Sequence, residues 1–134
     1  MRVLVTGSRD WPYPSVVEAE LNRVLANLPM TETLTVVEGA CPTGADAFAY
    51  QWVFRALKAG GPVKSERHPA DWAKHGKAAG PIRNQEMIDL GADLCLAFWH
   101  NASRGTHNCY TRASVAGIPV RLLTLDVTEM VGVR

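Results

Sequence analysis

The sequence predicts an α/β fold, a Rossmann-like three-layer sandwich in which about five parallel strands carry helices on both faces. Two observations predict it. Short apolar runs of strand length alternate with longer segments whose apolar residues recur at helical spacing. Glycine or proline separates most of these segments, and strands that alternate with helices pair in parallel through right-handed crossovers. The length of 134 residues suits one domain, so residues 1–134 are expected to form a single domain.

Two strand–helix units are predicted at the start of the chain. The apolar run 3–5 is typical of a strand buried on both faces. Residues 14–28 repeat apolar side chains at helical spacing, with Ser15 as a candidate N-cap. A second strand is expected over 34–37. A second helix follows over 45–57, and a Gly-Gly-Pro sequence ends it.

The third unit contains a long connection. Residues 63–67 predict a strand that is less apolar than the others and therefore lies nearer a sheet edge. The polar segment 68–80 is expected to be a loop. Pro81 suits a helix start, and the third helix is predicted over 83–90.

The most apolar run, 94–99, predicts a fourth strand. A fourth helix is expected over 106–116 and a fifth strand over 119–123. The order of the strands in the sheet does not follow from these patterns.

Composition excludes several classes of protein. A chain with 47% hydrophobic and 20% charged residues is not disordered. A net charge of +1 removes the usual electrostatic basis for binding duplex DNA or an anionic membrane, so a nucleic-acid or membrane partner is not expected. No apolar run approaches the roughly 18 residues of a membrane span. The apolar N-terminus is too short for a signal peptide, so a cytoplasmic location is expected.

No metal or cofactor is expected. The cysteines are far apart and form neither a CxxC pair nor a zinc pattern, which favours reduced thiols. They are Cys41, Cys95 and Cys109. His68, Asp71 and His75 lie close together in the sequence, but loop spacing defines no ligand geometry.

The loops that follow predicted strands differ from those that follow predicted helices. Connections after helices are short, as in 91–93 and 117–119. Connections after strands contain nearly all of the polar residues and aromatic residues found between elements. Ligands of open parallel sheets bind beyond the carboxyl ends of the strands, where the strand order reverses. This edge is therefore the predicted ligand site.

The first loop contains Gly7, Ser8 and Arg9. Glycine allows the backbone to approach an anion closely, and an arginine can bind phosphate oxygens with two parallel hydrogen bonds. The pattern is neither GxGxxG nor a Walker loop, so ordinary dinucleotide and P-loop sites are excluded.

The second loop has Gly39 and Gly44 just before a helix, whose first amides would face an anion. Asp46 falls in the first turn of that helix. Two roles are open for it: capping the helix, where a carboxylate meets the positive end of the dipole, or accepting hydrogen bonds from a ribose hydroxyl.

The third and fourth loops complete the predicted site. Trp72 could stack on a base or act as a hydrophobic plug that holds its loop down, and both roles stay open. Arg83 and Asn84 place a cation and an amide beside a ligand.

The fourth loop presents a hydroxyl, a glycine and the amides of a helix start, which form a second phosphate cradle. Its residues are Ser103, Gly105 and Thr106.

Four motifs resemble the YspA/YpsA-related branch of the SLOG superfamily. They occur in family order, span nearly the whole chain, and comprise Val3–Trp11, Val37–Asp46, Gly80–Met87 and Ser103–Thr106. The resemblance implies a Rossmann-like fold of bacterial or phage origin that binds nucleotides or nucleotide-derived ligands. Some members act as sensors linked to defence or stress. It also implies a homo-oligomer, such as a dimer formed through the third and fourth helices.

The main hypothesis is therefore a nucleotide-binding domain that senses or sequesters its ligand. Arg9 and Arg83 would hold phosphate, Asp46 the ribose, and Trp11 or Trp72 the base. The predicted ligand-binding residues are Gly7, Ser8, Arg9, Trp11, Gly39, Gly44, Asp46, Trp72, Arg83, Asn84, Ser103, Gly105 and Thr106.

The alternative is a phosphoribohydrolase that cleaves the N-glycosidic bond of nucleoside monophosphates, as LOG-type relatives do. Those relatives share the motif PGGxGTxxE, whose glutamate is catalytic. When this chain is aligned with the motif on Gly105, it has Asn101-Ala102-Ser103 at the first three positions and Cys109 at the position of the glutamate. Such an enzyme would need another carboxylate to activate water, from Asp10, Glu38, Asp46 or Glu86. Glu38 is the best candidate, because it ends the second strand at the edge where the ligand is expected. The alternative role for Glu38 is an ion pair with an arginine. A third hypothesis, binding of single-stranded nucleic acid through stacking tryptophans, fits poorly with the balanced charge.

Overall fold

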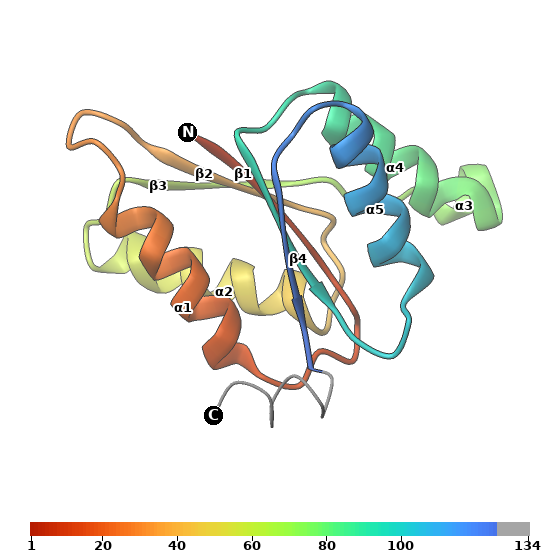
Figure 1. Cartoon of the computed structure of the whole chain (residues 1–134), viewed down its shortest axis with the longest axis horizontal. Helices are drawn as coiled ribbons and strands as arrows, with labels where there is room; N and C mark the ends of the chain where they lie inside the picture. The colour runs from red at the N-terminus through yellow and green to blue at the C-terminus, as the bar shows by residue number, and fades with distance from the viewer. Residues whose placement is uncertain (126–134) are drawn as a thin grey trace.

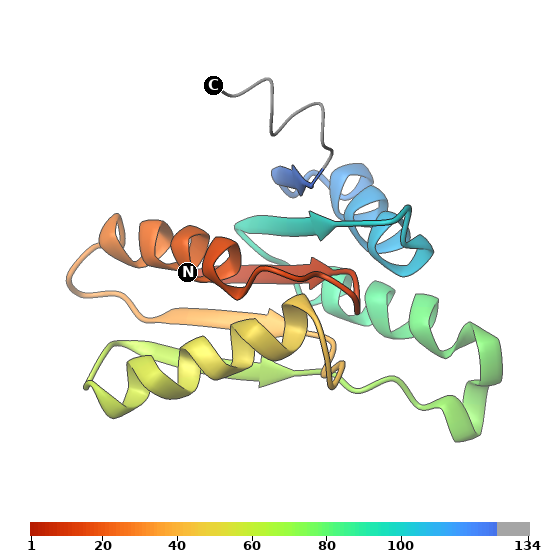
Figure 2. The same cartoon turned by 90° about the horizontal axis from the view of Figure 1, so that it is seen from below.

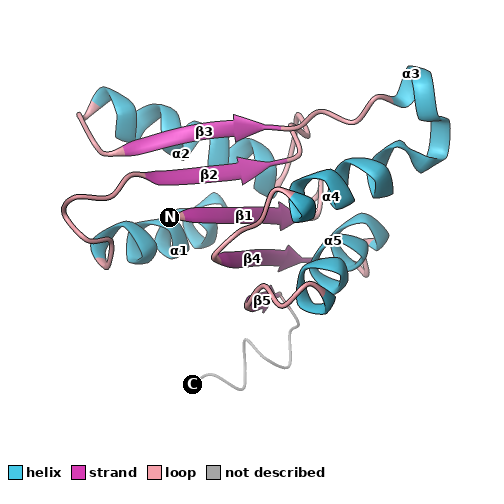
Figure 3. Ribbon diagram, turned by 90° about the horizontal axis from the view of Figure 1, so that it is seen from above, coloured by secondary structure: helices cyan, strands magenta, loops and turns pink. Residues whose placement is uncertain are grey.

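The structure is a computed structural model, and it describes residues 1–125. Residues 126–134, which the sequence assigns to the same single domain, lie outside the described residues. Five strands form one parallel sheet in the order β3-β2-β1-β4-β5 (Figure 3). They are β1 (Arg2–Gly7), β2 (Leu34–Glu38), β3 (Val63–Arg67), β4 (Leu94–Trp99) and β5 (Val120–Thr124). The prediction that 63–67 lies at an edge is confirmed.

Helices cover both faces of this sheet, so the predicted three-layer fold is confirmed (Figures 1 and 2). The helices are α1 (Pro14–Ala26), α2 (Ala45–Lys58), α3 (Trp72–His75), the 3-10 turn η1 (Gly76–Ala78), α4 (Ala79–Asp89) and α5 (Arg104–Val115). Helices α1 and α2 cover one face, and α4 and α5 cover the other. The short α3 projects beyond the carboxyl ends of the strands (Figure 3).

Alternating side chains of β1 supply both halves of the core. Val3 and Val5 point to one face and pack with Leu21 of α1, while Leu4 points to the other and packs with Met87 of α4. All three β1 side chains are fully buried, as a strand at the centre of a parallel sheet should be. Within residues 1–125, no helix combines the length and the apolar character that crossing a membrane requires.

Several local predictions are wrong. Ser15 is not the N-cap of α1, because the helix begins at Pro14 with Tyr13 at the N-cap, so Ser15 lies inside the first turn. Proline needs no amide partner in a first turn and its fixed φ suits a helix start. The fourth helix begins at Arg104 instead of residue 106, because the Ser103 side chain accepts a hydrogen bond from the Thr106 amide and caps it.

The segment 68–80 is not the plain loop that its polarity predicts. It contains α3 and η1, and α4 begins at Ala79, four residues before the predicted start. The Asp71 side chain caps α3 by accepting the Lys74 amide at 3.0 Å. Pro81 lies inside the first turn of α4, where the missing amide hydrogen costs nothing because first-turn amides have no partner within the helix.

Candidate functional site

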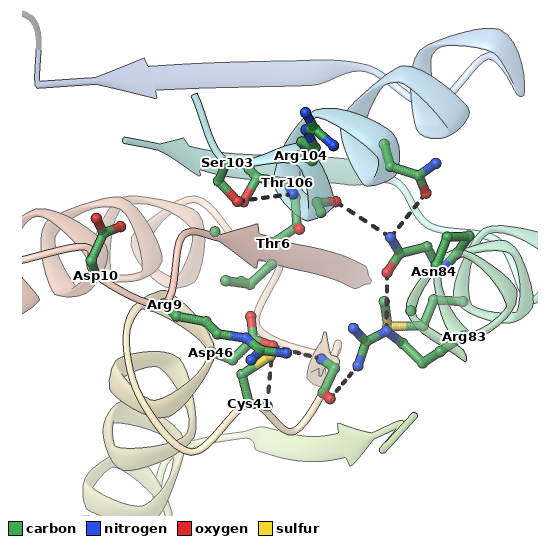
Figure 4. A pocket seen from close by; sticks show the side chains of 18 of the residues that line it. Thr6, Arg9, Asp10, Cys41, Asp46, Arg83, Asn84, Ser103, Arg104 and Thr106 are labelled. Carbon is green, nitrogen blue, oxygen red and sulfur yellow. Dashed lines mark hydrogen bonds between the residues drawn. The ribbon is translucent and has the colours of Figure 1, made fainter. Parts of the chain in front are cut away.

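A cavity of about 590 Å³ opens at the carboxyl ends of β1 and β4, between which the strand order reverses (Figure 4). The loops after the first four strands and the first turns of α4 and α5 surround it. This is the position at which parallel α/β sheets hold their ligands. Most of the predicted ligand-binding residues line this cavity. They are Gly7, Arg9, Gly39, Asp46, Trp72, Arg83, Asn84, Ser103, Gly105 and Thr106.

The structure adds polar residues that the sequence analysis did not assign. They are Thr6, Asp10, Cys41, Lys77, His100, Asn101, Arg104 and Asn108. Several of these residues could have been identified from the sequence. Lys77 lies in the long polar segment after β3, and Arg104 stands inside the fourth motif. Asn108 follows Arg104 by four residues, which places both on one face of α5.

The tryptophans of the predicted site have different environments. Trp11 is 2% exposed and belongs to the core, where its ring packs edge-on against Phe98 and its Nε1 donates to the Tyr13 carbonyl at 2.9 Å. Trp11 therefore does not face the cavity as a base-stacking residue. Trp72 is 50% exposed and lines the cavity, so it is not the buried plug that was its alternative role.

Ser8 and Gly44 do not line the cavity but hold its loops together. The Ser8 hydroxyl donates to the His100 carbonyl at 2.9 Å and accepts the His100 amide at 2.8 Å, which joins the loops after β1 and β4. At Gly44 the β2–α2 loop crosses the β1–α1 loop. A Cβ atom there would overlap the Ser8 carbonyl oxygen and lie 2.7 Å from the Arg9 Cα. These two residues support the cavity from behind.

Glu38, the candidate catalytic residue, is 1% exposed and is not among the residues that line the cavity. Its Oε2 accepts the Arg67 Nε at 2.7 Å, and its Oε1 accepts the Ala40 amide at 2.5 Å. Burial raises the pKa of this carboxyl, while the hydrogen bonds from Ala40 and Arg67 act against that rise. The arginine ion pair weighed in the sequence analysis is present.

Asp46 is the buried acid of the cavity. It lies in the first turn of α2, where a carboxylate meets the positive end of the helix dipole as expected from the sequence, but its side chain accepts no hydrogen bond from the amides of that helix. Its Oδ2 instead accepts the amides of Gly39 at 3.1 Å and Cys41 at 3.4 Å and so holds the β2–α2 loop (Figure 4). Burial, and then the negative charge of Glu38, raise the pKa of Asp46 to about 6. Asp46 therefore titrates close to neutral pH.

A chain of hydrogen bonds positions the Arg83 guanidinium. Its Nη1 donates to the carbonyls of Gly39 and His68, and its Nε donates to the Asn84 Oδ1 at 3.0 Å. The Asn84 Nδ2 in turn donates to the Asn108 Oδ1 at 3.1 Å. The site thus joins α4 to α5 through Asn84 and joins α4 to the β2–α2 loop through Arg83 (Figure 4).

The N-terminus of α5 faces the cavity. Ser103 and Thr106 are joined through their hydroxyls at 3.0 Å, and the Ser103 Oγ also accepts the Thr106 amide at 3.4 Å. The amides of Arg104 and Gly105 have no acceptor among residues 1–125. Such free first-turn amides carry the positive end of the helix dipole and attract anions.

Positive charge dominates the cavity. The cationic side chains that line it are Arg9, Lys77, Arg83 and Arg104. Among residues 1–125, two carboxyl groups also line it, Asp10 and Asp46. The first of these accepts the Asn101 amide nitrogen at 2.7 Å, and the second is partly protonated near its pKa of about 6. The electrostatic character of the cavity is that of an anion site.

Cys41 gives a chemical test of the cavity. It is partly exposed and lines the cavity, whereas Cys95 and Cys109 are fully buried. We expect a maleimide at pH 8 to modify Cys41 alone in the folded protein and all three cysteines in urea, as peptide mapping would show. Cys41→Ser should abolish the native label. Rapid native labelling of Cys95 or Cys109 would contradict the packing described here.

The sheet order, the helices on both faces and the cavity at the strand reversal define a Rossmann-like α/β domain. The chain belongs to the YspA, cpYpsA-related SLOG family (YAcAr), which matches residues 1–75. It is also 45% identical over 119 residues to the Gene 61 protein of Mycobacterium phage D29, a match that covers 89% of this chain and 93% of the phage protein. No solved structure matches the chain. The resemblance drawn from the sequence motifs is confirmed.

Proposed function

We propose that this protein binds a nucleotide or nucleotide-derived ligand in the cavity between β1 and β4 and acts as a sensor or sequestering module. The observation that carries the proposal is the gathering of four cationic side chains and the open N-terminus of α5 around one cavity. In the proposed complex, phosphate oxygens accept the amides of Arg104 and Gly105 and the Arg104 guanidinium. The family membership is consistent with this class of ligand.

Asp46 is proposed to contact the ribose. Its carboxyl lines the cavity floor, and its Oδ2 is held by two amides of the β2–α2 loop. A carboxyl group fixed in this way accepts hydrogen bonds from vicinal hydroxyls without rearranging. Arg83 is proposed to act mainly as a support, because its Nε and Nη1 already donate to Asn84 and to backbone carbonyls.

We favour binding over hydrolysis because of the positions of the acidic groups. Cys109, which replaces the catalytic glutamate of the LOG motif, is fully buried, and Glu38 is outside the cavity lining. Cleavage of an N-glycosidic bond needs a carboxyl group that can act at the sugar, and neither of these two positions supplies one. Asp46 does reach the cavity, but its Oδ2 already accepts two loop amides, so it is assigned to holding the ribose, and the assay for released base tests that assignment.

The test is a thermal shift of the purified protein against nucleoside monophosphates, NAD, ADP-ribose and cyclic nucleotides, with the same wells analysed for released base. A ligand at about 100 times its dissociation constant stabilises the fold by about 2.7 kcal/mol, a shift of several degrees. A shift without base release is the expected result. Base release would replace the proposal with a hydrolase, and a panel without any shift would overturn it.

Arg104→Gln tests the phosphate subsite. Arg104 is exposed at the start of α5, and its side chain makes no hydrogen bond to residues 1–125. We expect this substitution to lower the affinity for the most stabilising compound of the panel by about tenfold or more, because a charge-assisted hydrogen bond is lost. Arg55→Gln is the matched control, since Arg55 pairs with Glu18 and lies outside the cavity lining. Calorimetric titration would measure both, and equal affinities would contradict the assignment.

A further inference from the structure

Arg9 and Trp72 are neighbours in the lining of the cavity. The Arg9 Cζ lies 5.9 Å from the centre of the Trp72 ring. Arg9 comes from the loop after β1, and Trp72 comes from α3, which projects beyond the strand ends (Figure 3). The pair therefore brings together two segments that are far apart in the sequence.

Trp72 differs from the other tryptophans of the chain. The Nε1 atoms of Trp11, Trp52 and Trp99 donate to protein acceptors at 2.8 to 2.9 Å. The Trp72 Nε1 has no acceptor among residues 1–125, and half of the side chain is exposed. None of the residues of α3 or η1 is buried, so Trp72 does not anchor this segment in the core. A large, half-exposed aromatic surface that faces a cavity is typical of a contact made by a ligand.

Arg9 has the Trp72 ring as its partner, within cation–π range. Its guanidinium makes no hydrogen bond to the described residues, in contrast to Arg83, which is held by two carbonyls and Asn84. Elsewhere in the structure, cation and ring are in closer contact, at 3.9 Å for Arg67 over Tyr50 and 4.9 Å for Lys58 over Phe54. The Arg9–Trp72 spacing is wider, and an opening of about 1 Å would admit a flat ring that stacks at roughly 3.5 Å on each side.

Behind Trp72 lies the first turn of α4. The Cη2 atom of Trp72 is 3.5 Å from the position that a Cβ atom of Gly80 would occupy. This is an ordinary van der Waals distance, so a methyl group at Gly80 would only touch the indole. One edge of the ring therefore lies near α4, while Trp72 also lines the cavity beside Arg9.

We infer that Arg9 and Trp72 form a clamp for a planar aromatic ring, so that the ligand is a nucleobase-containing phosphate and not a sugar phosphate alone. This inference rests on the proposed function. It changes the role expected for Arg9 from the sequence, from holding phosphate to covering the face of a base. It also assigns the phosphate to the α5 N-terminus on the other side of the cavity, with Arg104 as its cation.

The experiment compares AMP and CMP with ribose 5-phosphate, which shares their phosphate and pentose but has no base. We expect the nucleotides to bind about tenfold or more tightly than ribose 5-phosphate, since stacking of a base on an aromatic side chain has an effect of this size. Trp72→Leu should remove that preference and leave the affinity for ribose 5-phosphate unchanged. Trp72→Phe should restore most of the preference, and Arg9→Met should weaken binding of the nucleotides more than binding of ribose 5-phosphate.

Phe54→Leu is the matched control, because Phe54 is an equally exposed aromatic residue that carries its own cation contact outside the cavity. A second readout is tryptophan fluorescence, which AMP should quench in the wild-type protein but not in Trp72→Phe. Equal affinity of the wild-type protein for all three probes would overturn the clamp and leave the proposed function standing. Loss of ribose 5-phosphate binding in Arg9→Met would return Arg9 to the phosphate. If no probe binds at all, both the clamp and the proposed function are overturned.

Discussion

Gly44→Ala is expected to lower the free energy of unfolding by about 3 to 5 kcal/mol, a loss of roughly 10 °C or more in Tm. Two costs add at this position. Gly44 has φ 76° and ψ −151°, a region of the backbone map that is essentially reserved for glycine and costs other residues about 1 to 3 kcal/mol. The new methyl group would also overlap the Ser8 carbonyl and approach the Arg9 Cα to 2.7 Å, which adds an overpacking cost of similar size.

Gly60→Ala separates these two costs. Gly60 also has a positive φ, 82°, but no atom lies within 4 Å of the position of a new Cβ. This control substitution should lower the free energy of unfolding by only about 1 to 2 kcal/mol, the penalty for a residue other than glycine in the left-handed region. Urea unfolding followed by circular dichroism would measure both variants. Similar values for the two would mean that the β1–α1 and β2–α2 loops do not cross as closely as described.

Asp46→Asn is expected to stabilise the protein by about 3 kcal/mol above pH 7 and to leave its stability near pH 4 unchanged. In the folded protein the Asp46 pKa is raised from 3.8 to about 6, chiefly by burial. The folded state therefore binds this proton more tightly than the unfolded state. The free energy of unfolding of the wild-type protein therefore includes the full contribution of the protonated Asp46 below about pH 3.8. This contribution is lost as the pH rises from about 3.8 to about 6, and the free energy of unfolding changes no further on this account at higher pH. An asparagine cannot ionise, so the variant lacks this loss.

The measurement is urea unfolding of both proteins from pH 4 to pH 8. The difference between the two isolates Asp46, because other titrating groups are common to both. Glu66, whose pKa the hydrogen bond from Arg2 lowers to about 2, contributes in the opposite direction and at lower pH. Asp10→Asn, at an exposed carboxylate of the same cavity, should change stability by less than about 0.5 kcal/mol. If the free energies of unfolding of wild type and Asp46→Asn differed by the same amount at every pH from 4 to 8, this result would contradict the raised pKa.

Asp46→Asn also connects stability with function. The asparagine carbonyl can accept the amides of Gly39 and Cys41 as the Oδ2 does now, so the loop should keep its shape. If Asp46 binds the ribose, the more stable variant should bind the nucleotide more weakly, since a charged acceptor is replaced by a neutral one. A buried carboxylate that lowers stability at neutral pH is expected where a binding site needs it.

The positions of most elements followed from local patterns, because hydrophobic periodicity and glycine stops act over a few residues. The run 3–5 and the run 94–99 lie at the centre of the sheet, where burial on both faces selects continuous apolar residues. Prediction failed where a single side-chain hydrogen bond decided the outcome. The Asp71 carboxylate starts α3 inside a polar segment, and the Ser103 hydroxyl sets the start of α5 two residues early.

The candidate site was predictable as a set of loops, because parallel strands place all of their carboxyl ends at one edge. Which residues of those loops face the cavity was not. Trp11 and Trp72 look alike in the sequence, yet Trp11 packs on Phe98 in the core and Trp72 stands open at the cavity. Glu38 and Asp46 are both acids of the β2–α2 region, yet only Asp46 reaches the cavity.

Local patterns along the chain were enough to predict a parallel α/β domain of the YspA, cpYpsA-related SLOG family with its polar loops at one edge of the sheet. They did not predict the strand order, the reversal between β1 and β4, or the pairing of Arg9 with Trp72 at the cavity, which follow from how the layers pack. The two sets of features differ in the distance along the sequence over which they are set. Periodicity and capping depend on neighbours along the chain, whereas strand order, burial of a particular carboxyl group and its pKa depend on residues that are distant in sequence and meet only when the layers pack.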